Sequence, residues 1–221
     1  MKKINYLHFL LVLFVFTGCS QKSVQFSNLK DRVYDYSSYG NLILHEGEPF
    51  SGVAFEEHPD EAIAHELSVR EGIPHGTFKD YYSNGQLEVK GTYKNGKWDG
   101  LLERYYENGQ LQSKETYKNG ERNGPVESYH ENGQLWSKGS YKNRDMDGPF
   151  EIYYENGQLG AKGTYKNDIL DGPYESYYEN GQLLSKGTYV NGKWDGPIEV
   201  YYEDGRLRQK GRYENGQFIS D

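Results

Sequence analysis

Apolar, polar and glycine positions recur along this chain with a period of 24 residues. In the unit GPYESYYENGQLLSKGTYVNGKWD, which begins at Gly172, two short runs rich in Tyr and β-branched residues flank Asn180-Gly181. Asn-Gly between such runs is a strong hairpin signal, because both central residues of a type I′ turn need a positive φ. We therefore predict a β-hairpin in each unit, with strands near residues 174–178 and 183–189 joined at Asn180-Gly181.

The end of each unit predicts how successive hairpins are joined. Asn191-Gly192 and Asp195-Gly196 are expected to form a second turn that leads into the next unit. Helix has almost no support, since glycine falls every few residues and no apolar stripe recurs at helical spacing. The predicted fold class is all-β, an elongated single-layer antiparallel meander of tandem 24-residue β-hairpin repeats in which strands pair only with sequence neighbours. A lone hairpin is marginal in water, so each copy should depend on the next.

Stacking the units in register predicts two different faces, because side chains alternate along a strand. We expect the apolar column to share one face with the Tyr82 column (Tyr82 and every 24th residue to Tyr202). The Glu column (Lys79, then Glu103 and every 24th residue to Glu199) should share the other face with the Tyr81 column. On the returning strand, we expect the Leu column (Leu87 and every 24th residue to Leu207) and the Tyr93 column (Tyr93 and every 24th residue to Tyr213) on one face, and the Lys column (Lys90 and every 24th residue to Lys210) on the opposite face. The apolar column is Phe78, Leu102, Val126, Phe150, Tyr174 and Ile198. The Tyr81 column is Tyr81, Tyr105, Tyr129, Tyr153, Tyr177 and Tyr201.

Three features of the repeat make further predictions. A glycine column runs through the returning strands, which suggests an aromatic ring lying over each glycine or a bend. Glu115 breaks that column, so the position tolerates a side chain at least once. Asn143-Arg144 and Asn167-Asp168 replace Asn-Gly at the second turn, where we expect a different turn or backbone strain.

The first twenty residues predict where the protein is located in the cell. Lys2 and Lys3 precede the short apolar run 7–16, which suits the h-region of a signal peptide, and small residues then lead to Cys19. This stretch resembles the lipobox of bacterial lipoproteins, apart from Phe16, where that family usually has a smaller aliphatic residue. The resemblance implies cleavage before Cys19, lipidation of its thiol and a membrane-anchored protein facing the periplasm or the cell surface. An ordinary secretory signal with a chance cysteine, or an N-terminal membrane anchor, is the alternative.

The motif GxYxxYYENGxLxxKGxYxxGxxxG resembles the MORN repeat, in its bacterial variant, over about residues 50–218. The resemblance implies an extended, twisted sheet of consecutive hairpins and a role in membrane attachment or protein scaffolding. Many bacterial members are catalogued as YwqK-like putative antitoxins. The domains predicted are a lipoprotein signal peptide (1–18), a lipidated N-terminus and tether (19–40), a divergent first repeat or cap (41–75) and six MORN-like hairpin repeats (76–221).

Charge and cysteine usage narrow the function classes. The chain has 25 Lys and Arg against 33 Asp and Glu, and loss of Lys2 and Lys3 would leave 23 against 33. This acidic balance argues against nucleic acid as a partner, because phosphate binding needs a basic face. Cys19 is the only cysteine, so an intrachain disulfide or a multi-cysteine metal site is not possible.

The sequence offers few candidate catalytic or metal-binding residues. The segment EEHPDEAIAHEL brings His58 and His65 near Glu57, Glu61 and Glu66, but the spacing matches no zinc signature, and an exposed acidic loop or short helix is expected. The Glu columns have equivalent neighbours, which favours Glu–Lys ladders over a catalytic pair. No catalytic residues, cofactor or metal are predicted, and the chain is not expected to be an enzyme.

The Tyr81 column is the candidate binding face, because tyrosine gives large contact area at low entropic cost. Packing within the sheet is the alternative role for these rings, and the more strongly favoured one for the Tyr82 and Tyr93 columns. The sequence therefore favours a lipid-anchored scaffold that binds an envelope protein. A glycan- or cell-wall-binding module and an antitoxin-like inhibitor of a partner protein are the alternatives.

Overall fold

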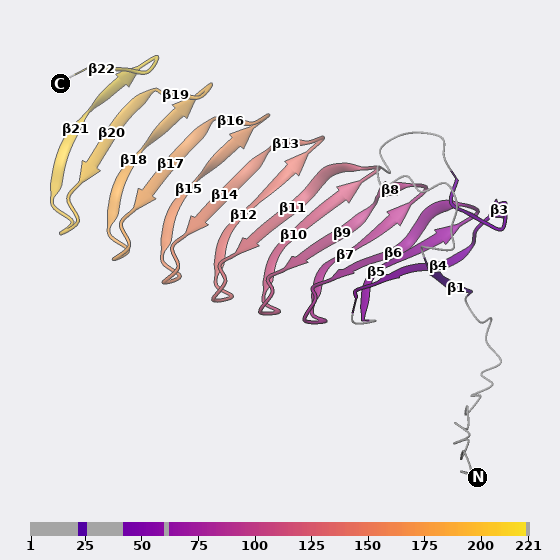
Figure 1. Ribbon diagram of the computed structural model, residues 1–221. Coiled ribbons are helices and arrows are strands. Elements are labelled where there is room, and N and C mark those ends of the chain that lie inside the picture. The colour runs from indigo at the N-terminus through magenta and orange to yellow at the C-terminus, as the bar shows by residue number, and fades with distance from the viewer. Residues whose placement is uncertain (1–21, 26–41, 60–61, 220–221) are drawn as a thin grey trace, which may run out of the picture.

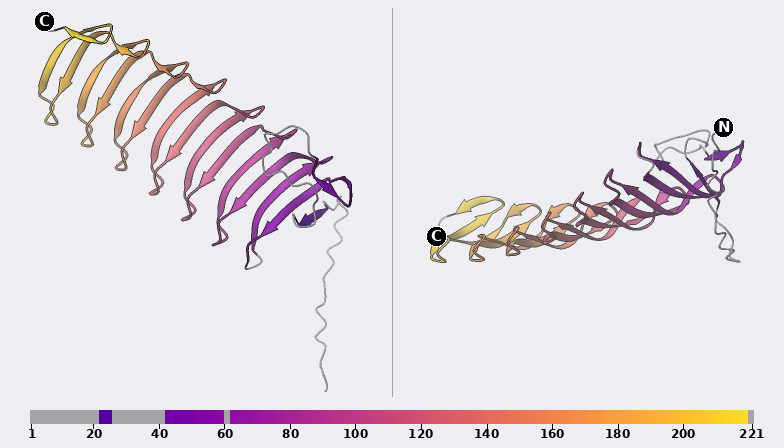
Figure 2. Two further views of the ribbon diagram at one scale, coloured as in Figure 1. Left: turned by 45° about the horizontal axis from the view of Figure 1, so that its top comes forward. Right: turned by 60° about the horizontal axis from the view of Figure 1, so that its bottom comes forward.

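The computed structural model describes residues 22–25, 42–59 and 62–219. Within these ranges the chain forms no helix, and a 20-stranded sheet and a two-stranded sheet hold all the strands. Figures 1 and 2 show the large sheet as one twisted layer, with β1 at one end and β22 at the other. The predicted all-β meander is confirmed. In the part of the chain that is described, no helix is long and apolar enough to cross a membrane. The predicted signal peptide and Cys19 lie outside the described residues.

The strands are β1 (Ser23–Gln25), β2 (Leu44–His45), β3 (Glu48–Pro49), β4 (Gly52–Glu57), β5 (Ile63–Arg70), β6 (Ile73–Tyr81), β7 (Leu87–Lys94), β8 (Lys97–Trp98), β9 (Gly100–Tyr105), β10 (Leu111–Lys118), β11 (Glu121–Tyr129), β12 (Leu135–Lys142), β13 (Asp145–Met146), β14 (Gly148–Tyr153), β15 (Leu159–Lys166), β16 (Ile169–Leu170), β17 (Gly172–Tyr177), β18 (Leu183–Val190), β19 (Lys193–Trp194), β20 (Gly196–Tyr201), β21 (Leu207–Glu214) and β22 (Gln217–Ile219).

From β4 to β22 the strands pair in antiparallel fashion with their sequence neighbours. The two-residue strands β8, β13, β16 and β19 each begin a returning strand that continues as β9, β14, β17 and β20. The exception is β1, which pairs in parallel with β4, matching Val24 to Ala54. The predicted tether is therefore wrong for residues 23–25, because Val24 is buried there and contributes to packing. The rest of the predicted tether, 26–40 and 19–21, lies outside the described residues.

The turn within each unit is not the predicted type I′ turn. Gly181 donates its N–H to the Tyr178 carbonyl, and the Tyr178 N–H is bonded to Gln182, which closes a three-residue loop. In that loop Gly181 has a φ of 81°, while Asn180 is not left-handed. This is a type I turn followed by a left-handed glycine. The Asn180 side chain makes two hydrogen bonds, since its Oδ1 accepts from the Gln182 N–H and its Nδ2 donates to the Glu203 carbonyl of the next unit at 3.0 Å.

This asparagine link explains why YYENGQL recurs. Equivalent asparagines, 24 residues apart, donate to the carbonyl of the following unit at Asn84, Asn108, Asn132 and Asn156. The last copy carries Asp204, which keeps the acceptor bond to the Arg206 N–H but has no amide to donate. Each asparagine thus pins its own turn and the neighbouring turn together.

The type I′ turn is found at the second edge, where Asn191 and Gly192 have φ of 49° and 77°. Asn143-Arg144 and Asn167-Asp168 adopt the same turn with all four residues left-handed, so the predicted strain is present and the turn does not differ. The reason is again the stack of repeats. The second turn residue donates its N–H to the preceding unit, as Gly192 does to Leu170 and Asp168 does to Met146.

The register slips by one residue near the type I turns. Leu111 pairs with Tyr105, whereas Ser113 pairs with Arg104, so an extra residue is accommodated between them. Paired residues share a face, and the Leu column therefore lies on the face of the Tyr81 column. The prediction that the Leu column shares a face with the Tyr93 column is wrong, because simple alternation does not cross a bulge.

The other side of the sheet, called here the apolar face, carries the apolar column and the Tyr93 column. Its rings pack on the strand glycines, as predicted: a Cβ at Gly91 would meet Trp98 at 2.6 Å, and one at Gly187 would meet Trp194 at 2.6 Å. Both Trp rings also stack on a tyrosine, Trp98 on Tyr93 at 3.9 Å between centroids and Trp194 on Tyr189 at 4.0 Å. Glycine is needed here because the ring occupies the space of a side chain.

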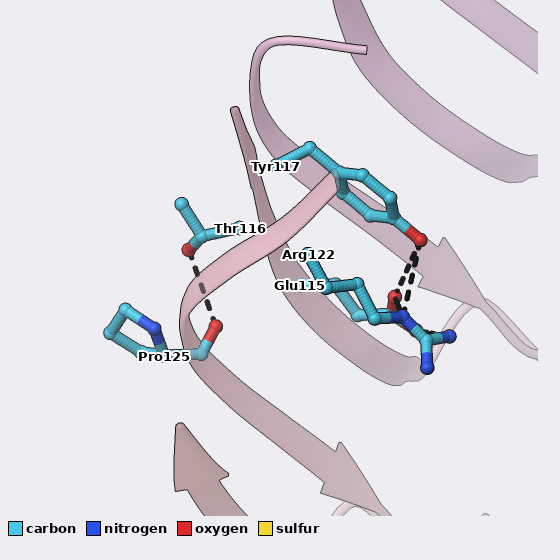
Figure 3. Close-up of polar contacts among 5 residues, drawn as sticks. All are labelled: Glu115, Thr116, Tyr117, Arg122 and Pro125. Carbon is cyan, nitrogen blue, oxygen red and sulfur yellow. Dashed lines mark hydrogen bonds and ion pairs between the residues drawn. The ribbon is translucent and has the colours of Figure 1, made fainter. Parts of the chain in front are cut away.

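The two exceptions in the glycine column are each matched by a change in the ring position. Glu115 faces Arg122, which stands where other units have Trp98 or Trp194, and the Arg122 Nε donates to the carboxylate at 2.8 Å. The Tyr117 hydroxyl donates to the same carboxylate at 2.9 Å, as Figure 3 shows. In the first unit Leu67 occupies the glycine position, and the smaller Pro74 occupies the ring position. The space is therefore filled in each case by a different pair.

The first unit carries the only concentrated core among the described residues. Val24, Ile43, Phe50, Ala54, Leu67, Val69 and Tyr93 form a buried cluster, with Phe78 and Trp98 packed against it. Within EEHPDEAIAHEL, residues 56–57 end β4 and residues 63–67 begin β5, so the expected loop or short helix is wrong for these strand residues, while residues 60–61 lie outside the described ones. Its alternation places Ala64 inside, at 4% exposure, which is the pattern of a half-buried strand.

Candidate binding faces

The second side of the sheet, called here the Tyr–Glu–Lys face, is a ladder of hydroxyl, carboxylate and ammonium groups. Tyr129 donates to Glu127 at 2.5 Å and Tyr201 to Glu199 at 2.5 Å. Tyr153 and Tyr177 donate in the same way to Glu151 and Glu175. The predicted sharing of a face by the Glu and Tyr81 columns is therefore seen in four consecutive units.

Lysines of this face link one unit to the next. Lys138 lies 2.7 Å from Glu151, Lys162 lies 2.8 Å from Glu175 and Lys186 lies 2.7 Å from Glu199, each across a unit boundary. The same ammonium groups lie 6.0 Å from the ring centroids of Tyr153, Tyr177 and Tyr201. Each tyrosine is therefore held both through its hydroxyl and through its ring.

The electrostatics of the ladder follow from these pairings. Hydrogen bonds from lysine and tyrosine lower the pKa of Glu151 and Glu175, and hydrogen bonds from Lys186, Tyr201 and Lys210 lower the pKa of Glu199 to about 2. Desolvation, with the neighbouring Glu127, raises the pKa of Tyr129 to about 12. Carboxylate and ammonium groups thus alternate along this face at neutral pH.

The structure brings the six predicted Tyr81-column residues onto one face, where all six are half-buried. At the first of them the pattern is altered: Lys79 takes the Glu position, and Tyr81 shares Glu66 of β5 with that lysine. The rings are thus part of the sheet's own packing and are also open to solvent.

The Tyr82 column serves to join repeats. Tyr82, Tyr106, Tyr154 and Tyr178 donate their hydroxyls to the carbonyl of the next Tyr81-column residue, at 2.7 to 2.9 Å. His130 makes the same contact to Tyr153 through Nε2 at 3.1 Å. Sequence reasoning missed that His58 does so as well, to Tyr81 at 3.0 Å. The signal was present, since His58 stands 24 residues before Tyr82.

Comparison with known proteins identifies the repeat. A family model described as a MORN repeat variant matches residues 74–95, 98–119, 122–143, 146–167, 170–191 and 194–215. The chain belongs to the MORN repeat variant family. Each matched segment runs from one apolar-face ring position to the next type I′ turn, so the family unit is the stacked hairpin described above.

The remaining comparisons add little. No curated protein matches the sequence. A crystal structure of an S. aureus TarM mutant in complex with fondaparinux, alpha-GlcNAc-glycerol and UDP is 11% identical, with a TM-score of 0.25. The match covers 54% of this chain and 21% of that chain, so the chain spans about a fifth of that protein's length. At this TM-score the likeness carries no argument.

Ahead of the six matched MORN repeats, the two histidines of the segment EEHPDEAIAHEL each have a partner on β6. His65 pairs through Nδ1 with Asp80 at 2.5 Å, whereas His58 contacts the Tyr81 carbonyl. Burial raises the pKa of Asp80, and the His65 contact opposes that shift. Over residues 22–25, 42–59 and 62–219, no group of three or more His, Cys, Asp or Glu side chains is arranged to hold a metal ion.

Proposed function

We propose that this protein is a non-enzymatic, lipid-anchored repeat scaffold of the bacterial cell envelope that binds another protein through its Tyr–Glu–Lys face. MORN repeats suggest a scaffold for protein or membrane interaction. The observation that carries the proposal is the repetition of one Tyr–Glu–Lys arrangement across consecutive units, with half-buried rings and lysines about half exposed. Rigid rings flanked by fixed charges suit a protein partner, because they offer contact area without ordering new side chains.

The anchor would attach the sheet by its cap. In the sequence only residues 20–22 separate Cys19 from Ser23, the first residue of β1. The four residue steps from Cys19 to Ser23 span at most about 14 Å when extended, so a lipid on Cys19 would hold β1 near the headgroups. Several acyl chains on one residue would anchor the protein firmly. The antitoxin alternative is less favoured, since an anchored chain outside the cytosol would not meet a cytosolic toxin.

Alanine at Tyr129, Tyr153 and Tyr177 tests the binding face. The matched control carries Phe at the same positions, which keeps each ring and removes only the hydroxyl. Both variants are first compared with the parent by circular dichroism, and partners are then captured from solubilised membranes. A partner kept by the Phe variant and lost by the folded Ala variant supports the proposal. An identical set of partners for all three proteins excludes the Tyr81 column as the binding surface.

Cys19→Ser tests the anchor. The variant should leave the membrane fraction and lose the mass of the lipid modification. A variant that stays in the detergent phase would exclude lipidation at Cys19.

A further inference from the structure

A pocket of about 580 Å³ lies on the apolar face beside the type I turns of two consecutive units. Trp136 and His130 of one unit line it together with Ile152, Tyr154 and Ala161 of the next. Trp136 is 51% exposed and Ile152 is 40% exposed, in contrast to Trp98 and Trp194, which stack on tyrosines. This part of the face leaves aromatic and aliphatic surface in contact with solvent.

The residues of the pocket depart from the repeat, and the fold does not require them. The floor consists of the cross-strand pair Ile152 and Ala161, whereas the next unit has Ser176 and Ser185, whose hydroxyls lie 2.7 Å apart. The preceding unit also has a serine pair, Ser128 and Ser137. Both neighbours thus form the same strands with a polar floor.

The residues that form the walls of the pocket also differ from those at the equivalent positions of the neighbouring units. The position of Trp136 is occupied by Gln112 in the unit before and by Gly160 in the unit after. The Tyr154 ring lies over Gly160, where a Cβ would meet its Cε2 at 3.2 Å, so no side chain from residue 160 covers that ring. His130 stands where the other units matched to the family have tyrosine, and its ring lies 6.2 Å from that of Trp136.

The rim of the pocket is acidic. Glu155 and Glu179, at the type I turns, are among the described residues that line it, and none of those residues is lysine or arginine. An apolar floor between aromatic rings with carboxylates at the edge complements a group with an aliphatic stem and a cationic head. Trp is the strongest aromatic partner for such a cation, and the carboxylates add direct attraction.

We propose that this pocket binds a lysine or arginine side chain of a basic, extended segment on the partner protein. The proposal rests on the protein-scaffold function above and adds a second contact, on the opposite side of the sheet from the Tyr–Glu–Lys face. The pocket would fix where along the repeats the partner lies, because the ladder itself is the same from unit to unit.

The test uses the whole chain and the probe acetyl-Gly-Arg-Gly-amide, followed through the indole signals of the three tryptophans. The Trp136 signal, identified by Trp136→Gln, should shift saturably while those of Trp98 and Trp194 stay in place. The matched probe carries citrulline in place of arginine, which keeps the shape and removes the charge, and should bind about tenfold more weakly. Ile152→Ser with Ala161→Ser copies the floor of the next unit, so it should fold and lose the shift.

Three results would overturn the proposal. These are no saturable shift with the arginine probe, equal binding of the citrulline probe, and a Trp136 shift with an N-acetylglucosamine oligomer in place of the peptide, which would assign the pocket to glycans. The titration contains no envelope partner, so its failure is independent of partner capture by the Tyr–Glu–Lys face. Loss of capture in a variant changed only at Tyr129 and Tyr177, which do not line the pocket, would conversely leave this titration unchanged.

Discussion

The first unit and the later repeats use the same backbone but pack it differently. In the first unit Leu67 fills the glycine position at 1% exposure and joins a cluster with Ala54 and Phe50. In the later repeats a ring packs against a glycine, as Trp194 does on Gly187, and most side chains stay half-buried. The first unit therefore has a small conventional core, whereas the repeats rely on many modest contacts between neighbours. Within the described residues, the first unit has a complete hairpin on one side and only the short parallel strand β1 on the other.

The largest expected effect separates the two kinds of packing directly. Leu67→Ala should lower the free energy of unfolding by about 2–5 kcal/mol, because it leaves a cavity in the buried cluster. Leu207→Ala is the matched control: the same side chain is 52% exposed there, and the loss should be below about 1 kcal/mol. Urea unfolding measures both. Equal losses would show that the first unit has no distinct core.

Replacing a glycine and its packed ring by the pair found in another unit tests whether the two positions stabilise the fold together. Gly187→Glu and Trp194→Arg should each cost about 1–3 kcal/mol, the first by collision with the ring and the second by loss of stacking on Tyr189. The double variant copies Glu115 and Arg122 and should recover part of that loss, with a coupling of about 0.5–3 kcal/mol. A double-mutant cycle by urea unfolding gives the coupling. Simple additivity would mean that the two positions are independent.

A smaller effect is expected at the type I turns. Asn180→Asp keeps the acceptor for Gln182 but removes the amide that donates to Glu203, at a cost of about 0.5–1.5 kcal/mol. Asp204→Asn is the control, because no following type I turn is present in the described chain to receive its amide. It should change stability little, and thermal unfolding compares the two. A loss of the same size at both positions would rule out the asparagine as a link between units.

The smallest effect should be that of pH. The lowered pKa of Glu151, Glu175 and Glu199 means that the unfolded chain takes up protons first as the solution is acidified. The contribution of these three ionised carboxylates to the free energy of unfolding is complete above the ordinary glutamate pKa of 4.5. It is lost as the pH falls towards the pKa in the folded state, which is about 2 for Glu199. These carboxylates lie at the sheet surface with 32%, 34% and 21% of each side chain exposed, and solvent screens the ion pairs, so the midpoint of urea unfolding should drift down only modestly between pH 5 and pH 3. Lys138→Gln, Lys162→Gln and Lys186→Gln together should flatten this drift, and an unchanged slope would dismiss the ladder as its cause.

Much of the fold could be predicted because the sequence repeats, and equivalent positions can be compared from unit to unit. The period locates the hairpins, and alternation correctly groups Glu151 with Tyr153 and predicts a ring over Gly187. Alternation failed for Leu111, since a bulge shifts parity and leaves no mark in the residue pattern. The role of Asn180 was misread, because Asn-Gly also suits a type I turn with a left-handed glycine, and only the stacked neighbour shows what the amide does. The pocket needed the structure, since Trp136 and Ile152 come from different units.

The central claim is that each hairpin is held by the hairpins on either side, and removal of one whole unit tests it most directly. Deletion of residues 124–147 joins Asn123 to Gly148 in the register of the repeat. Small-angle scattering should show a folded particle whose longest dimension is shorter by about 10 Å, the width of two strands. An unfolded chain, or a particle of unchanged length, would contradict the account.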